Sequence, residues 1–244
     1  MNIIFRYLIL TILVFNGLAI NQSNAQKKDI RVQSILDHHA KAIGFSKRQT
    51  INSLISFGSI EQMGNDLRVT ILQKRPNKYR LDIHLDDGRI TQAYDGRIGW
   101  SLNPYLSPDT ITIEGMELRQ LIESALFDGI LFNADQLNYT LEYGGEDHIA
   151  SSPSYILILK KPSGDRMKFF IDKTDYLIKR TEASIFLQGF PYESNSIFSD
   201  FREIEGMRLP FRIQNNNGQL STQIIVDTVR VNEVIEDGLF TGKK

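Results

Sequence analysis

The sequence predicts a mainly β protein in which short hairpins join antiparallel strands, accompanied by two helical segments. Apolar and polar residues alternate over 79–85, the pattern of a strand with one buried and one wet face. The Asp-Gly pairs at 87–88 and 95–96 are strong hairpin signals, because both turn positions tolerate positive φ. Strands do not alternate regularly with helices, which favours a sandwich or barrel over a βαβ fold.

The N-terminus predicts export from the cytoplasm. A single cation, Arg6, precedes a mostly apolar run over 7–20, which is shorter than the roughly 20 residues that a spanning helix needs. Small residues then mark a cleavage site, so we predict that residues 1–25 are a signal peptide removed after Ala25. The mature chain, 26–244, is expected to be a single periplasmic domain with no membrane span. The alternative is an uncleaved N-terminal anchor.

The composition excludes several classes of site. The chain has no cysteine, which rules out disulfides, thiol nucleophiles, Cys-ligated metals and acylation at the cleavage point. Its 28 basic and 29 acidic residues nearly balance, so nothing in the charge suggests nucleic acid as a partner. The core must therefore be held together by packing alone.

Two segments have helical periodicity. Apolar residues recur at helical spacing between Ile30 and Ile43, with Asp29 as N-cap and Gly44 as stop, which predicts an amphipathic helix. The same spacing returns over 116–132 with almost no polar break, and predicts one or two short apolar helices.

Strands fill most of the remaining chain, about ten in all. The first ones surround the hairpin turns between 63 and 96, and include 67–71 and 79–85. The later ones are expected at 137–143, 155–160, 167–171, 176–186, 195–204, 208–214 and 221–231.

Candidate catalytic and metal-ligating residues do not converge by spacing. His38 and His39 are helical neighbours about 100° apart, and neither His84 nor His148 has a second ligand placed to help it. No Gly-x-Ser-x-Gly elbow or phosphate loop occurs. We therefore predict no catalytic residue, no metal and no cofactor.

The apolar 116–132 segment permits two interpretations. A curved sheet with a wet outer face must cover its inner face, and two helices over a large sheet leave room for a cavity. The segment is then either core or a lid that touches a hydrophobic ligand. On the second interpretation the candidate lining residues are Leu81, Ile83, Trp100, Leu121, Phe127 and Phe132.

Three segments, 92–100, 169–180 and 198–210, carry a family resemblance. Together they resemble the LolA/LolB-like superfamily of outer-membrane lipoprotein-sorting proteins, in a divergent branch common in Bacteroidetes-type bacteria. The resemblance implies a curved antiparallel sheet that forms an incomplete β-barrel, with an N-terminal helix and a helical lid over an apolar concave face. It also implies an arginine that latches the lid, for which Arg68 and Arg80 are candidates by strand position.

The leading functional hypothesis is a non-enzymatic periplasmic carrier or sensor. Its partners would be a hydrophobic ligand, such as a lipid or the acyl chains of a lipoprotein, together with membrane proteins of the envelope. The alternative is an envelope protein-interaction module with a filled core and no ligand. A third hypothesis, an enzyme that uses a histidine or a carboxylate in a barrel cavity, would need a strongly shifted titration at His84.

Overall fold

A computed structural model describes residues 29–149, 151–187, 190–217 and 221–242 of the chain. The predicted signal peptide lies outside these residues. Within the described part, no helix has both the length and the apolar character needed to cross a membrane.

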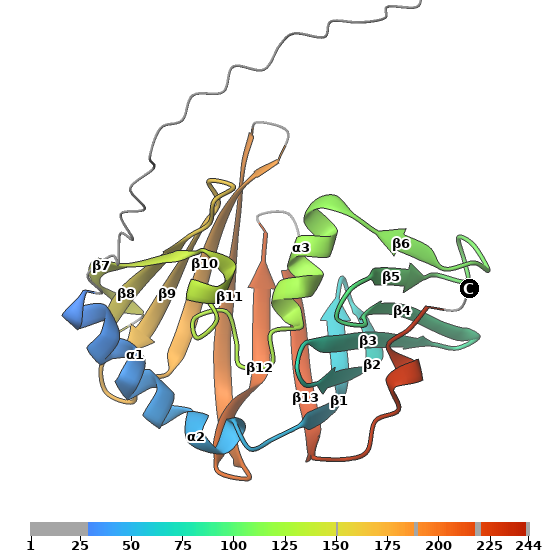
Figure 1. Ribbon diagram of the computed structural model, residues 1–244, viewed down its shortest axis with the longest axis horizontal. Helices are drawn as coiled ribbons and strands as arrows, with labels where there is room; N and C mark the ends of the chain where they lie inside the picture. The colour runs from blue at the N-terminus through green and yellow to red at the C-terminus, as the bar shows by residue number, and fades with distance from the viewer. Residues whose placement is uncertain (1–28, 150, 188–189, 218–220, 243–244) are drawn as a thin grey trace, which may run out of the picture.

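One antiparallel sheet of thirteen strands makes up most of the structure (Figure 1). Its strand order is β6-β5-β4-β3-β2-β1-β13-β12-β11-β10-β9-β8-β7. Nearly every strand therefore pairs with its neighbours in sequence, and the pairing of β1 with β13 joins the two halves of the sheet. The strands are β1 (Ser53–Gln62), β2 (Asn65–Lys74), β3 (Lys78–Leu85), β4 (Gly88–Tyr94), β5 (Gly99–Leu102), β6 (Ile111–Ile113), β7 (Thr140–Ile149), β8 (Ser152–Lys160), β9 (Arg166–Asp172), β10 (Ile178–Leu187), β11 (Phe190–Ile204), β12 (Met207–Asn216) and β13 (Ser221–Val231).

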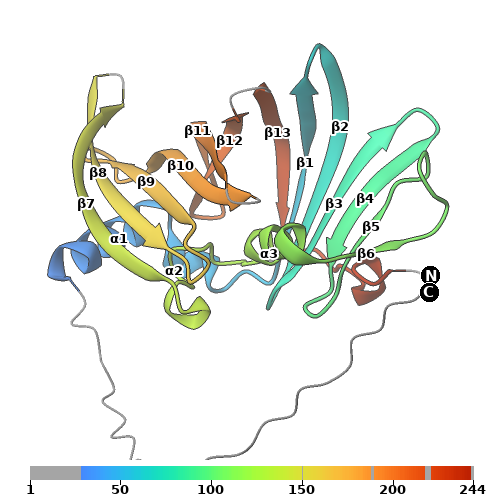
Figure 2. The same cartoon turned by 90° about the horizontal axis from the view of Figure 1, so that it is seen from above.

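The sheet is strongly curved but does not close. Figure 2 shows the strands following an open arc, with β7 at one end, β6 at the other and α3 across the open side. The predicted fold class, an incomplete antiparallel barrel, is confirmed. The number of strands was underestimated, in part because a strand as short as β6, with three residues, is too brief to show alternation.

The predicted hairpin turns form for local reasons. After β4, the Asp95 carboxylate accepts hydrogen bonds of 2.7 Å from the backbone N–H groups of Arg97 and Ile98. Gly96 supplies the positive φ, +100°, that the turn needs. At the end of β9, Asp172 accepts a 2.7 Å bond from the N–H of Thr174 in the same manner.

Within the residues that the structure describes, three α-helices accompany the sheet: α1 (Ile30–Ala42), α2 (Phe45–Arg48) and α3 (Gly115–Ser124). The predicted first helix is confirmed, with Asp29 accepting a 2.8 Å hydrogen bond from the N–H of Arg31. Gly44 turns the chain at φ +70°, and a Cβ there would lie 1.9 Å from the carbonyl oxygen of Gly206. The close approach fixes the α1–α2 junction against the start of β12.

The second helical segment is shorter than predicted. Regular helix ends at Ser124, and residues 125–134 run through turns before a 3-10 helix (Asp135–Leu137). Gly129 adopts φ +83°, a conformation that interrupts a helix. Apolar spacing alone could not show this break, because Phe127 and Leu131 are buried here although the segment is not helical.

Apolar side chains cover both faces of the sheet. We call the face that carries α1, α3 and the segment 125–134 the inner face. There α1 and the segment pack on β8 and β9, and α3 packs on β4 to β6. On the outer face, the chain after β13 packs Ile235 and Phe240 against Leu72 of β2.

Candidate functional site

A cavity of about 430 Å³ lies on the inner face, between β9 to β12, the α1–α2 junction and the loop 128–132, which we call the cover loop. Most of its walls are apolar. They include Ile43, Ile130, Phe132, Met167, Phe198 and Leu209. A concave, mostly apolar space of this size is typical of small-molecule sites, which span about 300–1,000 Å³.

Small side chains on the sheet create the space. Residues directly opposite one another in antiparallel strands point to the same face. Phe169 of β9 pairs with Thr181 of β10, which pairs with Ser196 of β11. Along this row of the inner face, the side chains thus become smaller, from a phenylalanine to a threonine and a serine. The two small side chains leave a gap on the concave side of the sheet.

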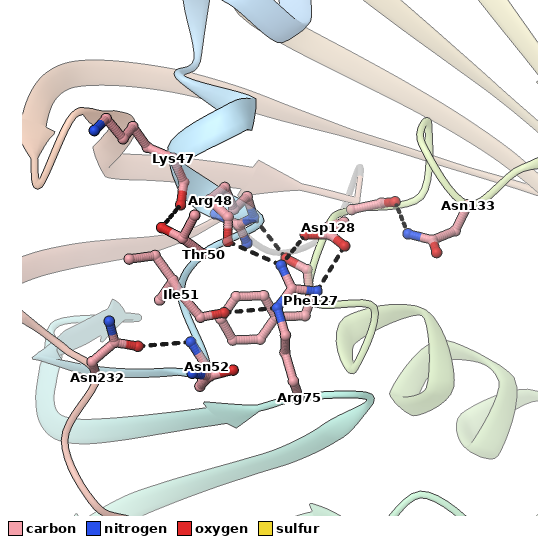
Figure 3. Close-up of polar contacts among 11 residues, drawn as sticks. Lys47, Arg48, Thr50, Ile51, Asn52, Arg75, Phe127, Asp128, Asn133 and Asn232 are labelled. Carbon is pink, nitrogen blue, oxygen red and sulfur yellow. Dashed lines mark hydrogen bonds and ion pairs between the residues drawn. The ribbon is translucent and has the colours of Figure 1, made fainter.

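Arg75 fastens the start of the cover loop to the sheet (Figure 3). Its guanidinium binds both carboxylate oxygens of Asp128 at 2.8 and 2.6 Å, and donates to the carbonyl oxygens of Ile51 and Arg48 at 2.7 and 2.9 Å. It also lies 4.4 Å from the centre of the Phe127 ring. The bidentate geometry is the strong form of an arginine–carboxylate pair.

Arg48 of α2 holds the same segment from the other side. Its Nε donates a 2.7 Å hydrogen bond to the carbonyl oxygen of Phe127. Burial lowers the pKa of the Arg48 guanidinium, Asp128 raises it, and the positive charge of Arg75 lowers it. An arginine remains protonated despite such shifts, so Arg48 is a half-buried cation at the cavity wall.

His39 of α1 is a neutral wall residue. It is 4 % exposed, and its Nδ1 lies 2.7 Å from the carbonyl oxygen of Tyr176, so Nδ1 carries the proton. Burial lowers the pKa of the imidazole, while the bond to Tyr176 raises it. Its ring stacks on Phe132 with centres 5.9 Å apart.

The six residues predicted to line a ligand site lie in five places. Phe132 lines the cavity. Phe127 is 2 % exposed beneath the two arginines, and Leu121 is the residue of α3 that is buried against β4 and β6. By sheet register, Leu81 and Ile83 face the inner side on β3. Trp100 lies on the outer face, where its indole N–H donates a 2.7 Å hydrogen bond to the carbonyl oxygen of Phe240.

Neither arginine proposed from strand position holds the cover loop. Arg68 pairs with Asp227, with side chains 70 % and 47 % exposed. Arg80 is buried on the outer face, where it binds Asp82 and the carbonyl oxygen of Leu239. The arginines that do bind the segment, Arg48 and Arg75, were missed because one ends a short helix and the other opens a turn.

The described residues contain no group of three or more histidine and carboxylate side chains placed to hold a metal ion. His84 shares a 2.9 Å hydrogen bond with Thr70 on the outer face, away from the cavity. His148 is exposed on β7.

No protein-family model matches the chain, and no curated protein matches its sequence. Its fold is nonetheless similar to solved structures. A LolA superfamily protein from Nitrosomonas europaea is 16 % identical with a TM-score of 0.61, covering 86 % of this chain and 97 % of that one. A domain from Vibrio parahaemolyticus assigned to outer membrane lipoprotein sorting is 11 % identical with a TM-score of 0.57, covering 86 % and 95 %.

A DUF1329 family protein from Desulfovibrio piger is 13 % identical with a TM-score of 0.52, covering 85 % of this chain and 97 % of that one. At these identities the likeness is one of fold. It agrees with the resemblance carried by the three sequence segments, although the particular branch stays a prediction. The chain therefore has a LolA-like fold.

Proposed function

We propose that the protein is a non-enzymatic carrier or sensor that shields a hydrophobic ligand in the cavity under the cover loop. The observation that carries this proposal is the cavity itself: about 430 Å³ of mostly apolar space on the inner face of the sheet. Native interiors leave few voids of this size, and an apolar space of this kind gains stability when an apolar ligand fills it.

The mode of closure supports reversible binding. The cover loop consists of turns between α3 and β7, and it is held by the packing of Leu131 in the core and by hydrogen bonds from Arg48 and Arg75. A segment without regular secondary structure can open locally while the sheet stays folded. Acyl chains of a lipid or lipoprotein are the ligand class that such a space suits.

The proposed setting is the periplasm, reached through removal of residues 1–25 as a signal peptide. The ligand would then be received from, and handed to, membrane proteins of the envelope. Among the residues predicted from sequence, Phe132 is retained as a wall of the ligand site.

The proposal is tested on the mature protein, purified gently from the periplasm of a Gram-negative host, by native mass spectrometry with lipid extraction. We expect a co-purifying lipid or acylated protein. Phe198→Asp should abolish it, because Phe198 lines the cavity on β11. The neighbouring Ile197, 38 % exposed on the opposite face, supplies the matched control Ile197→Asp, which should retain the ligand.

A clean apo mass, with no uptake of fluorescent fatty acids, would contradict the carrier. The protein-interaction module would then become the better account.

A further inference from the structure

The cavity has more positive than negative charge on its wall. Arg48, Arg208 and Asp128 are the residues among its lining that carry a full charge at neutral pH. Both oxygens of Asp128 are already bound by Arg75. Among the described residues, no carboxylate lies within ion-pair distance of Arg48 or Arg208. The paired charges cancel, which leaves two cations facing an apolar space.

Arg48 has hydrogen-bonding capacity to spare. Its side chain carries five N–H donors, and in the described part of the chain only Nε is bound, to the carbonyl oxygen of Phe127. The charge of Asp128 and the Phe127 ring, 5.3 Å from the guanidinium carbon, partly compensate the burial of Arg48, but they leave its terminal N–H groups without a hydrogen-bond acceptor among the described residues. Because it lines the cavity, its terminal nitrogens are open to a ligand.

Arg208 supplies the second cation from β12. Its backbone N–H donates a 3.1 Å hydrogen bond to the carbonyl oxygen of Ile43, which anchors this strand to the end of α1. The side chain is exposed and lines both the cavity and the adjoining surface. Its strand partner is Glu203, which lies beyond ion-pair distance. Arg208 therefore stands where the apolar space meets solvent.

We propose that the ligand is an acyl chain with an anionic head group, a carboxylate or a phosphate, which Arg48 and Arg208 bind while the chain fills the cavity. This inference rests on the proposed function and adds a chemical class to it. Guanidinium groups match both anions through paired N–H donors. The neutral His39 contributes no charge to this preference.

Competition binding with ligands of one chain length separates the head group from the chain. Palmitate, hexadecanol and hexadecyl phosphate would each displace a fluorescent fatty acid from the mature protein. We expect at least one of the two anions to bind about tenfold more tightly than the alcohol, the gain that one charge-assisted hydrogen bond provides. Tighter binding of palmitate would indicate that the natural ligand is a fatty acid, and tighter binding of hexadecyl phosphate would indicate a phospholipid head group.

Variants assign the preference to the two arginines. Arg208→Gln should reduce the ratio of anion to alcohol affinity without altering the fold, because Arg208 is exposed. Arg48→Gln should reduce the same ratio, and Arg48→Lys should restore it. Arg97→Gln is the charge-matched control, since Arg97 is an exposed turn residue beside β5 and should leave the ratio unchanged.

Equal affinities for the anions and the alcohol would overturn this inference and leave the carrier intact. An undiminished ratio in both glutamine variants would also overturn it. Failure of all three ligands to bind would instead contradict the proposed function.

Discussion

Replacing Arg75 with methionine removes four hydrogen bonds from the base of the cover loop but keeps a side chain of similar length. Two of these bonds go to Asp128, and the others go to the carbonyl oxygens of Ile51 and Arg48. The side chains of Arg75 and Asp128 are 24 % and 22 % exposed. Breaking a buried pair costs about 3–5 kcal/mol, and an exposed pair contributes about 0–1 kcal/mol. For this partly exposed pair we expect a loss of about 3 kcal/mol.

Urea unfolding monitored by Trp100 fluorescence measures this loss. A loss of that size corresponds to a fall in Tm of roughly 6–12 °C in a chain of this length. The matched control is Arg68→Met, since Arg68 and Asp227 form an exposed ion pair on the same sheet. This variant should lose less than about 1 kcal/mol of unfolding free energy. A double-mutant cycle that combines Arg75→Met with Asp128→Asn should give a coupling energy of about 2 kcal/mol between these two side chains. If Arg75→Met and Arg68→Met destabilise the protein equally, Arg75 does not fasten the loop.

Three further predictions concern the rest of the molecule. Trp100→Phe removes the hydrogen bond to Phe240 and should cost about 1 kcal/mol in urea unfolding followed by circular dichroism, since the variant has no tryptophan; fatty-acid affinity should stay unchanged because Trp100 lies on the outer face. Burial lowers the pKa of His39 below its unfolded value of about 6.5, so stability should be complete above that pH and fall as pH drops through the folded pKa. A His39→Phe variant whose pH profile of stability matched the parent would refute this. Gly44→Ala should prevent α1 from docking, because its Cβ would meet the carbonyl oxygen of Gly206; a parent-like Tm would show that the junction yields.

Local chemistry explains why the elements of the fold could be predicted. Asp95, Gly96 and Asp172 determine their turns through contacts within three residues, so their positions can be read directly from the sequence. The α1 helix likewise begins at its own capping residue, Asp29. Sheet curvature came from the family resemblance, because alternation shows which residues face inward but not how far the strands coil.

The site depends on contacts that sequence patterns do not encode. Arg75 meets Asp128 across 53 residues, and no periodicity connects a turn on the sheet with the loop after α3. The cavity lies where the sheet carries the small side chains of Thr181 and Ser196. That these two residues are neighbours is evident only once the strand register is known. Trp100 was placed on the inner face by expectation, and its outward direction follows from its pairing with Ala93, which pairs with Arg80.

The central claim is that the cavity under the cover loop holds the ligand, and photo-crosslinking locates the ligand directly. The mature protein would be loaded with a fatty acid that carries a diazirine near the end of its chain, irradiated and mapped by peptide mass spectrometry. We predict labels on the cavity walls, at Phe132, Met167 or Phe198, and their loss with excess unlabelled palmitate. Labels confined to the outer face, or labels that excess palmitate does not reduce, would contradict the account.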